Sequence, residues 1–374
     1  MTIIVLQGQS QNNVLRQFAY STHNAIQANG RSSVLVDLLE THWERRFQKL
    51  LSTESLSGIV AFNAVLGDLL SAELDIPYVA WLVDAPHYHF DRLRSSLHRR
   101  HVFCAAKHHL NFIKESSLSA NATVLLSGCE TLPSDIPIGG PRVHGVLIAA
   151  SWMGRPENFW SNFNDNRLIA ISKKSIELLN LNANVDAYQA VKSAAKINGA
   201  NFEFNQFWMF LVSQVHSYIR KLDRINAVES LVASGLPLTL VGSGWSEHIA
   251  LGRNVTVLES VDSSAMSALY RQAKVVVNLN ASNGSSERLF EAMNAGAAVV
   301  SEKSAVLAEY FKDGRDIQFF DRKRPSSLPD VVKELLGADR YVSVAARGRE
   351  RVRAAHTWDH RARSLLHVLD SIRA

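Results

Sequence analysis

The stretch that decides the fold is Ser285-Ser286-Glu287-Arg288-Leu289-Phe290-Glu291-Ala292-Met293-Asn294-Ala295-Gly296-Ala297-Ala298-Val299-Val300. It follows the apolar run Val275–Asn280 and the polar turn Ala281–Gly284. This order predicts a strand, a glycine-containing loop, a helix, a glycine stop and a second strand. Arg288 and Glu291 are three residues apart in the predicted helix, so they share one of its faces.

The start of this helix is predicted to bind an anion. A helix that begins after a Gly/Ser loop presents free backbone N–H groups to a ligand. Arg288 can add a two-pronged contact to a phosphate, and Glu291 suits a pair of sugar hydroxyls. The combination indicates a nucleotide-sugar site. Two other interpretations stay open: a surface ion pair between Arg288 and Glu291, and Glu287 as a charge favoured by the helix dipole.

Strands alternate with helices in both halves of the chain. In the first half the apolar runs that predict strands are Ile3–Gln7, Ser33–Leu38, Ser57–Phe62, Tyr78–Val83, Val102–Ala105, Ala122–Leu126 and Val143–Ala149. In the second half they are Leu238–Gly242, Val255–Glu259, Val275–Asn280, Ala297–Glu302 and Ile317–Phe320. Between them, Leu168–Leu181, Val185–Lys196 and Asn205–Ala233 have the periodicity of helices. Such alternation predicts an α/β protein with two doubly wound, Rossmann-like parallel sheets.

The predicted domains follow from this pattern. At 374 residues the chain exceeds the usual size of one hydrophobic core, about 250–300 residues. We expect an N-terminal domain over 1–165, a helical connector over 166–234, a C-terminal domain over 235–355 and a final helix over 356–374. Ligands of doubly wound sheets bind beyond the carboxyl ends of the strands. Two such domains are therefore expected to face each other across a central cleft.

Composition and charge restrict the class of protein. The chain is 47% hydrophobic and 20% charged, which is typical of a globular protein, and none of its apolar runs approaches the roughly 20 residues of a membrane span. The start, Met1–Leu6, is expected to be a buried strand rather than a signal peptide. Cys104 and Cys129 do not make a disulfide framework, so a cytoplasmic location is expected. A net charge of +5 leaves peripheral association with the inner face of the plasma membrane open, whereas no motif supports nucleic-acid binding.

Polar loops at predicted strand ends give the candidate donor residues. Gly242, Ser243, Gly244 and Trp245 follow one strand; the glycines would let the backbone approach a ligand, and Trp245 would either cover a base or seal the sheet. The loop lacks the third glycine and the acidic partner of a dinucleotide fingerprint. The remaining candidates lie before the opening helix and on it: Asn280, Asn283, Gly284, Ser285, Arg288 and Glu291.

The first half offers candidates for acid–base chemistry. Trp81–Val83 leads directly into Asp84, and His87 and His89 follow. Asp84 is the first candidate for a general base and His87 the second, because both lie at a strand's carboxyl end. The alternative is that Asp84 only caps the next turn. A metal pair of His87 and His89 lacks a third ligand at clear spacing, so no metal site is predicted.

A second loop of the first half is expected on the acceptor side. Gly8, Gln9 and Ser10 follow the first predicted strand, and His89 is assigned to the same side. The loop has no lysine and is therefore not a P-loop.

The second half resembles the C-terminal domain of CgeB-like (spore-maturation-type) glycosyltransferases, a bacterial group of the GT-B architecture. The similar segments are Arg224–Val228, Val241–Trp245, Ser286–Ala292, Tyr310–Gly314 and His356–Arg361, in the same order. The segment Trp81–Pro86 is similar to the equivalent part of their N-terminal domain.

The resemblance implies a nucleotide-sugar donor, held mainly by the C-terminal domain. Many GT-B enzymes carry two glutamates eight residues apart. Glu291 matches the second, which contacts ribose, and Asn283 stands at the position of the first, a sugar contact. The family generally needs no bound metal, and Arg288 with the helix N-terminus would stabilise the departing diphosphate. The final helix is expected to cross back to the first domain.

The function expected from these observations is transfer of a sugar from a nucleotide-diphosphate sugar to an acceptor hydroxyl. UDP-, GDP- and dTDP-sugars all stay open as donors, and a glycan, a lipid-linked glycan or a protein as acceptor. No permanently bound cofactor is predicted. Two alternatives remain: a nucleotide-sugar epimerase of the same fold, and a non-catalytic protein that binds sugars or polyanions.

Overall fold

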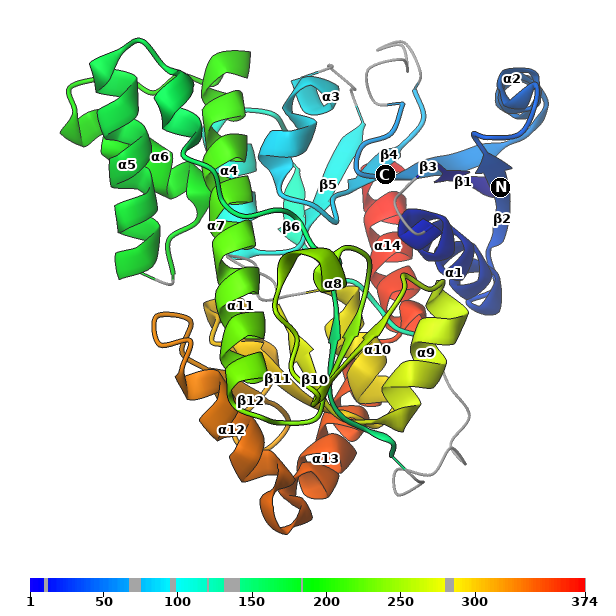
Figure 1. Cartoon of the computed structure of the whole chain (residues 1–374). Coiled ribbons are helices and arrows are strands. Elements are labelled where there is room, and N and C mark those ends of the chain that lie inside the picture. The colour runs from blue at the N-terminus through cyan, green and yellow to red at the C-terminus, as the bar shows by residue number, and fades with distance from the viewer. Residues whose placement is uncertain are drawn as a thin grey trace. The chain divides into compact units, whose positions relative to one another are not determined.

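The computed structural model describes residues 1–9, 13–66, 75–94, 99–119, 121–130, 142–182, 184–279 and 286–373. The chain forms two compact units. The first unit consists of Met1–Thr131 together with Ala355–Ala374, and the second of Leu132–Ala354. Among the described residues, each unit is built on one parallel six-stranded sheet with helices beside it (Figure 1). The predicted α/β architecture with two doubly wound parallel sheets is confirmed.

The first sheet has the strand order β2-β1-β3-β4-β5-β6, and all its neighbours are parallel. Its strands are β1 (Thr2–Gln7), β2 (Ser32–Asp37), β3 (Leu56–Phe62), β4 (Tyr78–Trp81), β5 (Arg100–Cys104) and β6 (Ala122–Val124). The helices of this unit are α1 (Val14–Ala28), α2 (Trp43–Thr53), η2 (Pro86–His89), α3 (Phe90–Arg94), α4 (Lys107–Glu115) and α14 (Trp358–Arg373). The chain adds β2 on one side of β1 and then β3 to β6 on the other side. The carboxyl ends of β1 and β3 are therefore the switch point of this sheet.

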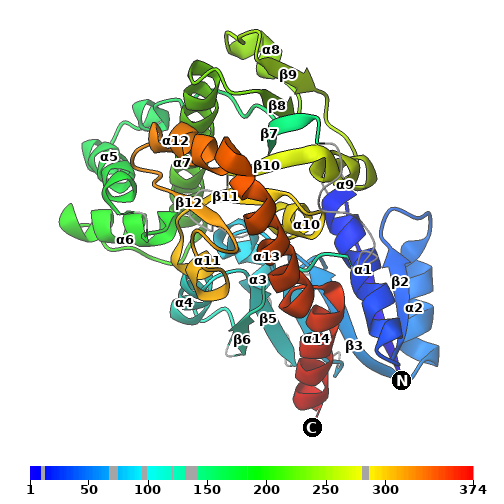
Figure 2. The same ribbon diagram turned by 90° about the horizontal axis from the view of Figure 1, so that it is seen from below.

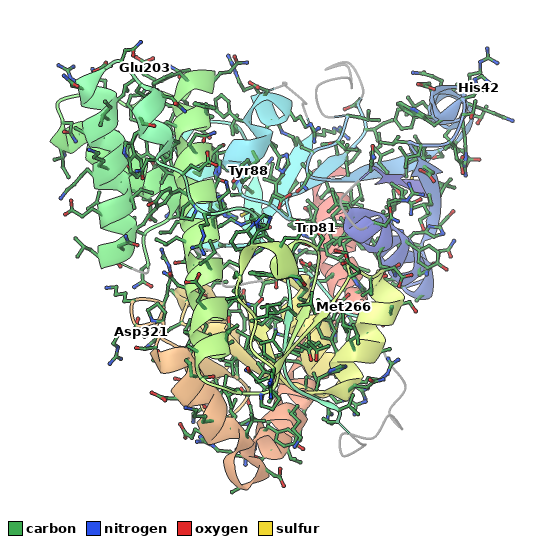
Figure 3. All side chains as sticks on the ribbon, in the orientation of Figure 1. His42, Trp81, Tyr88, Glu203, Met266 and Asp321 are labelled. Carbon is green, nitrogen blue, oxygen red and sulfur yellow. The ribbon has the colours of Figure 1, made fainter. Side chains whose placement is uncertain are left out.

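Aromatic side chains form the centre of the first unit's core. Trp358, at the start of α14, packs against Phe18, Phe62 and Trp81 with ring centroids 5.1, 6.5 and 5.8 Å away. Trp81 at the end of β4 (labelled in Figure 3) is 2% exposed. The C-terminal helix α14 therefore completes a hydrophobic core that includes Phe18, 340 residues before Trp358 in the chain.

The second sheet has the order β12-β11-β10-β7-β8-β9. Its strands are β7 (His144–Ala149), β8 (Leu238–Val241), β9 (Val255–Leu258), β10 (Ala273–Asn278), β11 (Ala298–Glu302) and β12 (Gln318–Phe320). Its helices are η3 (Phe159–Asn162), α5 (Asn166–Leu181), α6 (Ala187–Ile197), α7 (Gln206–Ala233), α8 (Trp245–His248), α9 (Ser263–Gln272), α10 (Glu287–Asn294), α11 (Ala305–Tyr310), α12 (Ser327–Leu336), η4 (Gly337–Asp339) and α13 (Arg340–Ala355). Figure 2 shows α7 and α12 on one side of this sheet and α9, α10 and α11 on the other.

The strands of the second sheet are added outward from β7, first on one side and then on the other. From β7 the chain adds β8 and β9 on one side, then returns to add β10, β11 and β12 on the other. The switch point therefore lies at the carboxyl ends of β7 and β10, which are paired in parallel. Ligands of such sheets bind at this point.

One strand differs from the prediction. Val143–Ala149 was expected in the N-terminal domain, but β7 is a central strand of the second sheet, between β10 and β8. The helices α5, α6 and α7, expected as a separate connector, belong to the same unit. Alternating apolar runs predict a strand without its pairing partner, so the sequence does not reveal which sheet β7 joins.

No helix in the described part of the chain is long and apolar enough to cross a membrane.

Candidate functional site

Two arginines converge on the carboxyl end of β7, at the switch point of the second sheet. Arg288, in the first turn of α10, donates a hydrogen bond to the carbonyl oxygen of Ala149. Arg224, on α7, donates to the carbonyl oxygen of Ser151 over 2.6 Å. The elements that carry them lie on opposite sides of the sheet. Two cationic side chains thus meet where a doubly wound sheet binds its ligand.

The two guanidinium groups repel each other. The pKa of Arg224 is lowered to about 9, first by burial and then by the charges of Arg288 and Arg220. Arg224 is 8% exposed, whereas the side chain of Arg288 is 31% exposed and faces Glu287 at 3.7 Å between Nε and Oε1. An anion between these groups would relieve the repulsion.

A buried hydrogen-bond network positions the start of α10. The Ser286 hydroxyl donates to Oδ1 of Asn278 over 2.7 Å, and Nδ2 of Asn278 donates to the Ser301 hydroxyl over 2.9 Å. Asn278 and Ser286 are 4% and 7% exposed. The Asn278 side chain therefore links β10, β11 and the first residue before α10.

Glu291 lies one turn beyond Arg288 and is half-buried. The Tyr270 hydroxyl on α9 is fully buried next to it: burial raises the pKa of Tyr270, and the negative charge of Glu291 raises it further. Arg288 acts on the same hydroxyl in the opposite direction. The predicted pair of Arg288 and Glu291 therefore shares one polar environment on α10.

The glycines of the loop after β8 have a structural reason. Gly242 has φ +146°, and a Cβ atom there would lie 2.6 Å from the Ala150 oxygen and the Ser151 nitrogen. Gly244 has φ +85°, and its Cβ would lie 2.9 Å from Trp152. Both glycines thus allow close packing against the segment that follows β7. Their predicted contact with a ligand stays a prediction, and Ser243 between them is exposed.

Trp245 was expected either to cover a base or to seal the sheet, and its burial favours sealing of the sheet. The side chain is fully buried, and its indole N–H donates to the Ala150 carbonyl over 2.6 Å. It is part of the hydrophobic core beside α7. An indole in this position seals the end of the sheet and has no face open to a base.

Five predicted site residues lie outside the described residues. They are Ser10, Asn280, Asn283, Gly284 and Ser285. The strand expected to continue to Asn280 ends at Asn278.

In the first unit, the switch point carries the predicted acceptor-side residues. Gly8 and Gln9 directly follow β1, and Asp84 follows β4. Asn63, at the end of β3, lies in the left-handed region with φ +51° and is 5% exposed. Its Oδ1 accepts hydrogen bonds from the backbone N–H of Val83 and Asp84, at 2.9 and 3.3 Å, and its Nδ2 donates to Oδ2 of Asp84 over 2.9 Å.

Asp84 and the two histidines have different environments. The Asp84 side chain is 57% exposed, so its carboxylate is accessible, and Nε2 of His89 lies 3.8 Å from its Oδ2. His87 is 7% exposed and packs against Tyr88 with ring centroids 4.3 Å apart. The structure therefore brings Asp84 and His89 together and buries the ring of His87.

Three residues, one in the first unit and two in the second, were not among the predicted site residues. Asn63 gave no signal, because its role depends on the pairing of β3 with β4. The sequence around Arg220 and Arg224 indicates only the charged face of a long helix. Their spacing of four residues was the one available sign that they share a side of α7.

In the described part of the chain, no group of three or more His, Cys, Asp or Glu side chains is arranged to hold a metal ion.

Comparison with known proteins relates this arrangement to glycosyltransferases. Residues 220–367 match the family described as glycosyl transferase-like. That segment contains Arg224, Arg288 and Glu291. No curated protein sequence matches the chain.

Solved structures match over nearly the whole chain. Sucrose-phosphate synthase from Thermosynechococcus elongatus is 12% identical with a TM-score of 0.58, covering 99% of this chain and 98% of its own. HepE from Anabaena, in complex with UDP-glucose, is 13% identical with a TM-score of 0.56, covering 99% and 100%. T4 phage BGT, also in complex with UDP-glucose, is 8% identical with a TM-score of 0.52, covering 100% and 99%. At these identities the likeness establishes the fold. The chain therefore has the GT-B fold, and its residues 220–367 are similar to a glycosyl transferase-like family.

Proposed function

We propose that this protein transfers a sugar from a nucleotide-diphosphate sugar to an acceptor hydroxyl, and that its second unit binds the donor. The observation that carries the proposal is the convergence of Arg288 and Arg224 on the carboxyl end of β7. A diphosphate at this switch point would meet two guanidinium groups and the free N–H groups of the first turn of α10.

The donor residues have separate roles in this proposal. Arg288 and the start of α10 stabilise the negative charge that develops on the departing diphosphate. Glu291 accepts hydrogen bonds from the ribose hydroxyls. Ser243, exposed after β8, contacts the nucleoside, and Asn280, Asn283, Gly284 and Ser285 contact the phosphates and the sugar. UDP is the first nucleotide to test, because HepE and T4 phage BGT were solved with UDP-glucose.

The first unit contributes the acceptor side. Asp84 takes the proton of the attacking hydroxyl, since its carboxylate is accessible and is held by Asn63. His89 stabilises the charge on Asp84 from 3.8 Å, and His87 is the second candidate for the base. Gly8, Gln9 and Ser10 contact the acceptor, a glycan, a lipid-linked glycan or a protein.

The finer class rests on the sequence resemblance. We propose a CgeB-like bacterial enzyme of the cytoplasm whose basic segments can associate with the inner face of the plasma membrane. We also propose that no metal is required, because Arg288 and the helix N-terminus supply the positive charge; activity that survives EDTA would agree with this. Residues 220–367 match a glycosyl transferase-like family, and the similar structures of HepE and T4 phage BGT hold UDP-glucose, so transfer is preferred to epimerisation.

A thermal-shift screen of UDP, GDP and dTDP tests donor binding. We expect one nucleotide to raise the unfolding temperature of the wild type. Arg288→Ala should weaken that nucleotide roughly 10- to 100-fold, the loss expected for a charge-assisted hydrogen bond. Arg315→Ala, a second-unit arginine whose side chain is 57% exposed, is the matched control and should bind as the wild type does. Stabilisation by none of the nucleotides would contradict the proposal.

A further inference from the structure

A pocket of the second unit is lined by three arginines that the donor site does not fully use. It lies between α7 and the carboxyl ends of β10, β11 and β12, and its charged lining consists of Arg220, Asp223, Arg224, Glu302 and Arg322. Leu279, directly after β10, closes one side. We call it the arginine pocket. Three cationic groups against two carboxylates leave it with an excess of positive charge.

Arg322 has donor capacity to spare. Its side chain is 8% exposed, and its Nε lies 2.6 Å from Oδ2 of Asp223 on α7. Its Nη2 atom is buried and has no hydrogen-bond partner among the described residues. A buried guanidinium N–H without an acceptor is unfavourable, because it has lost its hydrogen bonds to water. Arg322 follows Asp321, which Figure 3 labels.

Asp223 neutralises Arg322 only in part. Burial raises the pKa of Asp223, although the charge of Arg322 and its hydrogen bond act in the opposite direction. The carboxylate thus carries its charge less readily than a solvated one. The positive charge of the arginine pocket is consequently not fully balanced, and another anion would balance it.

The pocket connects to the donor site through Arg224. This side chain lines the pocket, and its pKa responds to both Arg220 and Arg288. A ligand whose diphosphate contacts Arg288 could therefore place a neighbouring group at Arg224 and Arg322. In a nucleotide-sugar the diphosphate joins the nucleoside to the sugar, and of these two groups only the sugar can carry a further anionic group.

The size of the pocket favours a small planar anion. Its cavity volume is about 20 Å³. A water-sized group needs about 10–15 Å³, so the cavity admits the oxygens of a carboxylate but not a sugar ring. A carboxylate also matches the planar, two-pronged geometry of a guanidinium group.

We propose that Arg322, with Arg220 and Arg224, binds a carboxylate on the donor sugar, so that the donor is a nucleotide-diphosphate uronate. This inference rests on the proposed function, since it adds a sugar class to the same donor. The ring would remain outside the arginine pocket while its carboxylate enters. The donor diphosphate also presents anionic oxygens to an arginine, and donors with a neutral sugar contain the same diphosphate.

The test compares a matched pair of donors, for example UDP-glucose and UDP-glucuronate, with the nucleobase that the thermal-shift screen selects. We expect wild-type protein to bind the uronate at least tenfold more tightly, as titration calorimetry would measure. In Arg322→Gln this preference should fall to about onefold, while the neutral sugar binds as before. Arg324→Gln, two residues away with a side chain 75% exposed, is the matched control and should keep the preference.

The outcomes separate the hypotheses. Equal wild-type affinity for the two sugars would overturn the uronate proposal and leave the transferase function intact. If Arg322→Gln weakens both sugars equally, the arginine contacts the diphosphate and the proposal is also wrong. Failure of every nucleotide sugar to bind would instead contradict the proposed function. If Arg322→Gln does not fold, Arg220→Gln on its half-buried side chain provides the same comparison.

Discussion

At the scale of single residues, the glycines of the loop after β8 have a packing role that the sequence alone does not reveal. Gly242 and Gly244 follow a strand in the way that ligand-binding glycines do. In the structure, their missing Cβ atoms make room for the Ala150–Trp152 segment after β7. The packing of this segment sets the positions of the carbonyls that Arg288 and Arg224 bind. The glycines therefore help to position the backbone carbonyls to which Arg288 and Arg224 donate.

Gly242→Ala should destabilise the second unit. The substitution forces a Cβ to within 2.6 Å of backbone atoms at a φ of +146°, so a loss of about 2–4 kcal/mol in the free energy of unfolding is expected. Gly235→Ala is the control: it has φ +73° but open space around the Cβ, and should cost about 1 kcal/mol. Urea unfolding measures both. Equal effects would show that the contact with Ala150 is unimportant.

At the scale of elements, α10 could be predicted from local signals. Glu287–Asn294 lies between a polar loop and Gly296, and both signals are local. The partners of its first turn could not be predicted in the same way. Ser286, Asn278 and Ser301 meet only because β10 pairs with β11, and pairing is a long-range property. The same holds for Asn63, which reaches Asp84 across two neighbouring strands.

The helix α14 is the element that completes the first unit's core. Trp358→Ala removes a side chain that packs against Phe18, Phe62 and Trp81, so a loss of about 3–5 kcal/mol is expected. Ser364→Ala, on the exposed side of the same helix, should change stability by no more than about 0.5 kcal/mol. Thermal unfolding followed by near-ultraviolet circular dichroism measures the difference. A Trp358→Ala protein as stable as the wild type would contradict the assigned packing.

At the scale of the whole molecule, the number and type of the sheets could be predicted from the sequence. Which strand belongs to which sheet could not. Alternating apolar runs and helices predict doubly wound parallel sheets. They do not show that β7 joins the second sheet, nor that Arg224 and Arg288, 64 residues apart, reach the same strand end. Both facts depend on the order β12-β11-β10-β7-β8-β9. The proposed donor site thus depends on topology as much as on the residues in its motif.

The most direct test of the central claim is the release of nucleoside diphosphate from a panel of UDP-, GDP- and dTDP-sugars, measured by chromatography with and without acceptors. We expect the wild type to release the diphosphate of one nucleotide, faster when a suitable acceptor hydroxyl is present. Arg288→Ala should release it at least tenfold more slowly, because it lacks the group that stabilises the leaving diphosphate. Release from no donor, a sugar that isomerises while still attached to its nucleotide, or release that is unchanged in Arg288→Ala would contradict the account.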